Sequence, residues 1–168
     1  MRNLETVQLV GVALFCIHMA GAATAPIPLA GQWRFSLDSD KAGLGREFFN
    51  KELPGRIKLP GTTDEAKLGV PNPSKANEDG LYRPNVYEGM AWYQRDIDIP
   101  DSWRGKRVTL FLERTHWTTE VWVDGKSAGT QDSLIAPHVY EFPEGILPGQ
   151  KSSRFASRWS TLRAEKRK

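Results

Sequence analysis

Apolar and polar residues alternate with a period of two along several short stretches of the chain. In residues 32–37, Trp33, Phe35 and Leu37 fall on one side and polar residues fall on the other. This alternation is typical of a β-strand with one buried face. A shorter strand is predicted at residues 57–59, where the pattern runs into a Pro-Gly-Thr turn.

The most regular alternation covers residues 92–99 and is ended by a proline. It predicts a strand with one apolar face, made of Tyr93, Ile97 and Ile99, and one polar face that includes Gln94.

Four further strands are predicted downstream, at residues 108–112, 119–123, 126–131 and 138–142. The Asp124-Gly125 pair predicts a two-residue hairpin, because both positions of such a turn need a positive φ.

Two stretches lack this periodicity. Residues 38–55 are polar, with a short helical turn expected around residues 47–49, and residues 64–89 are predicted to form a long irregular loop. No internal repeat and no long amphipathic helix are found in the sequence. The fold class predicted from these patterns is all-β, an antiparallel β-sandwich of the jelly-roll type.

The N-terminus has the features of a signal peptide at residues 1–22. Arg2 precedes an apolar run over residues 9–20, and Ala20-Gly21-Ala22 is a cleavage pattern of small residues. The run is too short to cross a bilayer, which takes roughly 20 apolar residues. We therefore expect a secreted or periplasmic protein with no membrane partner after cleavage. The alternative is a buried hydrophobic helix.

The excess of basic residues is confined to the end of the chain. The chain carries a net charge of +3 and the stretch from Lys151 carries +6, so the remainder has a net charge of −3. A nucleic-acid-binding domain has a basic face on its folded body. Nucleic acid is therefore excluded as the main partner.

Five segments, in this order and spacing, resemble the N-terminal sugar-binding domain of glycoside hydrolase family 2. They are Ala-Gly-Gln-Trp-Arg-Phe at 30–35, Leu-Pro-Gly-Thr at 59–62, Trp-Tyr-Gln-Arg at 92–95, Val-Trp-Val-Asp-Gly at 121–125 and Asp-Ser-Leu at 132–134. The resemblance covers residues 30–149. The family includes β-galactosidases, β-glucuronidases and β-mannosidases. It implies a galactose-binding-like jelly roll that is followed, in the family, by an immunoglobulin-like domain and a catalytic barrel.

The resemblance implies a carbohydrate partner, a β-glycoside or glycan, but no catalysis by this chain. The two catalytic glutamates of the family lie on the barrel, and a barrel alone takes about 250 residues. With 168 residues, the chain has no room for one, so the catalytic domains of a parent enzyme are an expected partner. The alternatives are a free-standing lectin-like glycan-binding module and a truncated remnant without function.

Residues 150–168 depart from the family pattern, which continues with an alternating strand. The segment has no clean period of two, and we predict a basic tail that is non-native or disordered. One interpretation is a shift of the reading frame. Without the family's alternating strand, the sandwich lacks three inward apolar side chains, and burial of each is worth roughly 1.5–3 kcal/mol. We therefore predict that the chain has marginal stability.

The resemblance places two loops of this domain at the rim of the family's active site. The matching substrate-binding candidates are Asn85, Glu88, Trp117, Asp132 and Ser133. Asp132 and Ser133 also suit a turn in which they bond the local backbone, and Glu88 suits a solvated loop. Trp117, just before a strand, suits a sugar-stacking platform.

No cofactor and no metal are expected. His116 and His138 lack cysteines or paired acids at metal-ligand spacing, and a structural hydrogen bond is the expected role of His138. The sequence contains no phosphate-binding glycine motif and no nucleophile elbow.

Overall fold

A computed structural model describes residues 25–73, 82–142 and 153–160. Its elements are β1 (Gly31–Asp38), β2 (Gly55–Leu59), β3 (Val70–Pro71), β4 (Asn85–Val86), β5 (Met90–Ile97), the 3-10 helix η1 (Asp101–Trp103), β6 (Thr109–Leu112), β7 (Thr118–Val123), β8 (Lys126–Asp132), β9 (His138–Glu141) and β10 (Ser153–Ser160). All strand pairs are antiparallel, so the predicted all-β antiparallel sandwich is confirmed. The predicted signal peptide at residues 1–22 lies outside the described residues.

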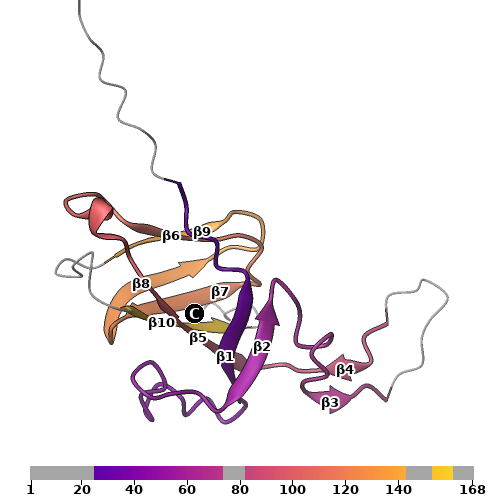
Figure 1. Cartoon of the computed structure of the whole chain (residues 1–168). Coiled ribbons are helices and arrows are strands. Elements are labelled where there is room, and N and C mark those ends of the chain that lie inside the picture. Colours follow the sequence, from indigo (N-terminus) through magenta and orange to yellow (C-terminus); the bar gives the residue numbers. More distant parts are fainter. Residues whose placement is uncertain (1–24, 74–81, 143–152, 161–168) are drawn as a thin grey trace, which may run out of the picture.

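The larger layer is a six-stranded sheet in the order β2-β1-β5-β10-β7-β8. The smaller layer is the β6-β9 pair, which lies across one face of this sheet (Figure 1). The β3-β4 pair forms an arm beside the sandwich (Figure 1). The stretch predicted as one irregular loop thus contains a short ribbon.

The face of the large sheet that looks toward β6 and β9, called the inner face, carries the main core. Trp33 and Phe35 of β1, Tyr93 of β5 and Val121 of β7 are buried there, together with Leu110 of β6. Burial of these alternate residues is the physical reason for the predicted strand pattern, because side chains of one parity point to one face.

The opposite, outer face of the sheet is also buried. Trp92 and Trp122 stack with ring centroids 5.1 Å apart, and Phe48 and Phe49 pack against them. Gln94, which the alternation assigned to a polar face, is fully buried here. The predicted polar face is not open to solvent at Gln94, because residues 42–53, which fold as successive turns rather than a helix, cover it.

Polar groups under this cover are paired. The side-chain amide of Gln94 donates to the Lys51 carbonyl at 3.0 Å and accepts from the Arg34 guanidinium at 2.8 Å. The indole N–H of Trp92 donates to Asp38 at 2.8 Å. A buried polar group is tolerated when it is hydrogen-bonded. For this reason β5 can carry the polar Gln94 and still lie in the middle of the sheet, between β1 and β10.

The prediction of a non-native or disordered tail at residues 150–168 is wrong for Ser153–Ser160. These residues form β10, which pairs with β5 on one side and with β7 on the other. Ala156 packs on the outer aromatic cluster, whereas Ser157 and Trp159 face inward. Arg158 pairs with Glu120 at 2.5 Å. The strand therefore alternates, although its polar residues conceal the period.

Candidate rim site

The connection between β6 and β7, residues 113–117, has an unusual backbone. Arg114 has a φ of 55° and Trp117 a φ of 54°, in the left-handed region that bulky side chains rarely adopt. Trp117 is half-exposed, and its carbonyl accepts the Ser133 N–H at 3.2 Å. Strained backbone of this kind concentrates at functional sites, which makes this connection a candidate.

The turn between β8 and β9, residues 132–137, lies directly beside that connection. Asp132 ends β8 opposite Thr118. The Ser133 hydroxyl accepts N–H groups of Ile135 and Ala136 at 3.2 and 2.9 Å. The predicted turn role therefore belongs to Ser133. The exposed carboxylate of Asp132 has no hydrogen bond to any residue that the structure describes.

A buried network ties the two segments together from below. His138 is 1% exposed, and its Nδ1 lies 2.5 Å from the Thr119 hydroxyl and 3.1 Å from that of Thr115. Its Nε2 lies 3.2 Å from the Ser133 carbonyl oxygen. The Tyr140 hydroxyl donates to the Thr119 carbonyl at 2.8 Å, and burial raises the pKa of that phenol. The structural role predicted for His138 is confirmed.

We call residues 113–117 and 132–137 together the rim. They bring together three of the five predicted site residues, Trp117, Asp132 and Ser133. Sequence reasoning missed Arg114. Its guanidinium is exposed and has no ion pair with the described part of the chain. No sequence signal distinguishes this arginine, because its position depends on a backbone conformation that the residue types do not predict.

The other two predicted residues come from a different element. Asn85 lies in β4 opposite Pro71, and its N–H donates to the Asp64 carboxylate at 2.7 Å. Glu88 is exposed just before β5. The register places the start of β5 and the start of β7 at the same end of the sheet, with β10 between them. Two strand spacings are about 10 Å, so Glu88 and the rim lie at the same end of the sheet.

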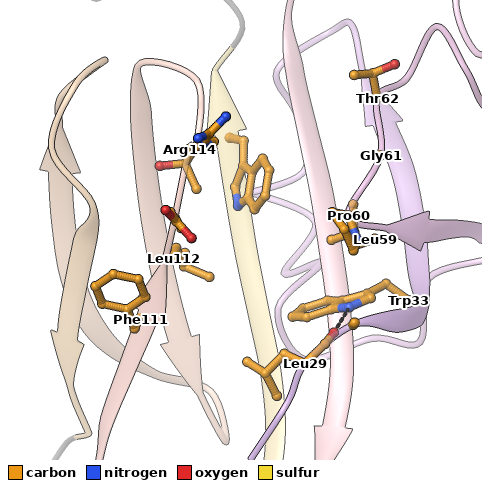
Figure 2. Close-up of a pocket in the computed structure, with 13 residues that line it drawn as sticks. Leu29, Trp33, Leu59, Pro60, Gly61, Thr62, Phe111, Leu112 and Arg114 are labelled. Atoms are coloured by element: carbon orange, nitrogen blue, oxygen red, sulfur yellow. Dashed lines mark hydrogen bonds between the residues drawn. The ribbon is translucent and has the colours of Figure 1, made fainter.

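An open groove of about 430 Å³ begins at the rim and passes between the two layers. Figure 2 shows Phe111, Leu112 and Arg114 on one wall, and Trp33, Leu59, Pro60 and Thr62 on the other. Trp33 is fixed by its indole N–H, which donates to the Leu29 carbonyl at 2.9 Å. Trp159 of β10 also lines the groove. The sequence did not predict this feature, because β10 itself was not predicted.

Within the described ranges, no group of three His, Cys, Asp or Glu residues is placed to hold a metal ion. No helix in the same ranges is long and apolar enough to span a membrane.

No family model matches the chain. It is similar to the β-glucuronidase of Paenibacillus borealis, with 25% identity over 125 residues, and to that of Sus scrofa, with 32% identity over 129 residues. These matches cover 74% and 71% of the chain, and 19% and 17% of the relatives.

Solved structures agree at the level of the fold. The β-glucuronidase of Ruminococcus gnavus matches with a TM-score of 0.59 and 22% identity, and that of Lactobacillus rhamnosus with a TM-score of 0.64 and 20% identity. Each match covers 79% of this chain and 20% of the solved chain. The chain thus spans about a fifth of the length of these relatives. The predicted resemblance to glycoside hydrolase family 2 is confirmed, and the relatives are its β-glucuronidases.

Proposed function

We propose, from the premise that this chain is a homologue of family 2 β-glucuronidases, that it is a non-catalytic carbohydrate-binding domain whose rim contacts the sugar. The single observation that carries the proposal is the exposed combination of an indole, a carboxylate and a guanidinium on the rim. Trp117 is half-exposed beside Asp132. Arg114 lies three residues before Trp117, in the connection between β6 and β7. Sugar sites combine an apolar aromatic surface with a few placed polar groups.

Each group has a separate role in this proposal. The Trp117 ring packs on the apolar face of a pyranose, and the Asp132 carboxylate accepts a hydrogen bond from a sugar hydroxyl. The guanidinium of Arg114 pairs with a uronate carboxylate through its planar fork. Asn85 of β4 and Glu88, which precedes β5, contact a second sugar unit. The ligand class is a glycan with a terminal β-glucuronide, as the relatives' name suggests.

The proposal includes no hydrolysis by the chain itself. Retaining glycosidases need two carboxyl groups about 5 Å apart across the scissile bond, and the family holds them on a barrel of about 250 residues. We propose that residues 30–160 form the sugar-binding unit, that a catalytic barrel is its partner, and that residues 1–22 export the protein to a secreted or periplasmic location.

One observation favours a second candidate, a free-standing lectin-like module. A module that binds glycans alone has to complete its own sheet, and β10 pairs on both of its edges. The two candidates differ in their partner, because only the first predicts complex formation with a co-expressed family 2 catalytic barrel.

The test is a titration of the purified chain with methyl β-glucuronide, methyl β-galactoside and methyl β-mannoside, followed by NMR. We expect shifts at rim amides with the glucuronide. Trp117→Ala should weaken binding about three- to tenfold, the value of one aromatic contact. Trp103→Ala is the matched control, since Trp103 is equally half-buried but lies in η1. The absence of shifts with all three sugars would refute the proposal.

A further inference from the structure

The two layers of the sandwich differ in width. Six strands form one layer, and β6 and β9 form the other within the described residues. β9 lies beside β8, because the Val139 N–H donates to the side chain of Gln131 in β8 at 3.0 Å. The second edge of β6 therefore faces the inner surface of β1 and β5, and no described strand pairs with it. An edge of this kind presents unpaired N–H and C=O groups.

The register identifies the backbone groups on this edge. The Phe142 N–H donates to the Val108 carbonyl, so Val108 is the first hydrogen-bonded position of the ladder. In an antiparallel pair these positions alternate, and Leu110 and Leu112 are therefore the next to bond β9. It follows that Thr109 and Phe111 direct their N–H and C=O groups to the opposite edge.

An apolar trough follows this edge. The groove of about 430 Å³ is lined by residues 111–115, and a second cavity of about 260 Å³ is lined by residues 108–111. The two cavities share Leu29 and Phe111, so they are consecutive. Only Thr109–Leu112 of this lining is strand, and four residues span about 13 Å at the rise of an extended chain.

The wall of the trough opposite β6 is apolar. It is formed by Leu29, Trp33 and Leu59 in one half and by Ile97, Ile99 and Trp103 in the other. Charged residues line only the rim end, where Glu113 and Arg114 lie. This shape and chemistry suit an extended backbone with apolar side chains at alternate positions, which point down into the trough.

We propose that the edge of β6 accepts an extended peptide strand from a separate polypeptide, by β-strand addition. The peptide pairs with β6 over about four residues, with apolar residues at every second position and a carboxylate where it meets Arg114. Backbone hydrogen bonds to Thr109 and Phe111 supply general affinity, and the trough selects the side chains. This inference shares Arg114 with the sugar proposal, but its test uses Phe111 and the amides of the β6 edge rather than Trp117 and Asp132.

The experiment selects peptides from a random eight-residue library displayed on phage, using the full chain as bait. We expect enriched sequences that alternate apolar and polar residues. Their synthetic peptides should bind the unchanged chain and Phe111→Ala, which keeps its N–H. Phe111→Pro, which removes a donor that β9 does not use, should weaken binding at least tenfold. Proline is tolerated at such an edge position.

A second measurement decides the question even where Phe111→Pro does not fold. Amide hydrogen exchange is followed by NMR with and without the enriched peptide. We expect peptide to slow exchange at Thr109 and Phe111 at least tenfold, and to leave Leu110 and Leu112 unchanged. Uniform slowing over all four amides, failure to enrich alternating sequences, or equal affinity for Phe111→Pro and Phe111→Ala would overturn the proposal.

Discussion

The most informative perturbation is removal of β10. A chain that ends at Ser152 lacks the whole strand, and it leaves β5 and β7 without their shared neighbour. β10 forms eight residue pairs with β5 and five with β7. An antiparallel ladder averages about one hydrogen bond per residue pair, and each bond contributes roughly 1 kcal/mol net. The ladder alone is therefore worth on the order of 13 kcal/mol.

That value is comparable with the whole stability of a domain, about 5–15 kcal/mol. Packing adds to it, since Ala156 and Ser157 are fully buried and the Trp159 ring lies 4.2 Å from that of Tyr93, between centroids. We expect the chain ending at Ser152 to be unfolded at room temperature. A chain ending at Ser160 is the matched control, because it removes eight residues but leaves β10 whole.

Near-ultraviolet circular dichroism and tryptophan fluorescence, followed during thermal unfolding, measure both variants. The control should melt cooperatively at the same midpoint as the full chain. The shorter chain should show no cooperative transition and no fixed aromatic signal. Equal midpoints for the two truncated chains would refute the placement of β10 in the centre of the sheet.

Two further predictions concern the hairpin and the core. Gly125→Ala should lower the free energy of unfolding by more than the cost of a positive φ to a residue with a Cβ, about 1–2 kcal/mol, because Gly125 has a φ of 76° and an added Cβ would also lie 2.5 Å from the Asn50 side-chain oxygen. Gly105→Ala is its control, with a φ of 73° and no atom within 4 Å of the added Cβ, and urea titration that shows an equal or larger loss for this control would contradict the close contact. Burial raises the pKa of Tyr93 above its ordinary value near 10. The unfolded chain therefore releases this proton first, so stability is fully present below pH 10 and falls as pH rises above it. Tyr93→Phe should flatten this decline between pH 10 and 11 in urea unfolding, and an unchanged slope would show that Tyr93 does not contribute to it.

Much of the fold could be predicted from the sequence where one face of a strand is buried and the other is polar. Trp33, Phe35 and Leu37 alternate for this reason, and β1 covers them as predicted. The Asp124-Gly125 turn was also predictable, because both residues have the positive φ that this hairpin requires, 47° and 76°.

Strands covered on both faces were harder to predict. Trp92 and Gln94 are buried under residues 42–53, and no local period indicates that cover. In β10, the buried Ser157 and the paired Arg158 have the residue types of an exposed segment. Their burial depends on long-range partners, Glu120 among them, which a local pattern cannot specify.

For the candidate site, the sequence predicted some of the residues but not their conformation. The sequence indicated Trp117, Asp132 and Ser133, and the β7–β8 register brings them together. The left-handed conformation of Trp117 and the exposed position of Arg114 depend on the connection between β6 and β7. The trough depends on the unequal width of the two layers, which follows from the pairing of strands rather than from any motif.

β10 separates β5 from β7 and so sets the distance between Glu88 and the rim at that end of the sheet. The register of β10 is therefore the most direct test of the proposed fold and site. Cross-strand nuclear Overhauser effects in the isotope-labelled full chain measure it. The structure predicts backbone contacts from Ala156 to Gln94 on one side and to Trp122 on the other. Random-coil shifts for residues 153–160, or direct contacts between β5 and β7, would contradict it.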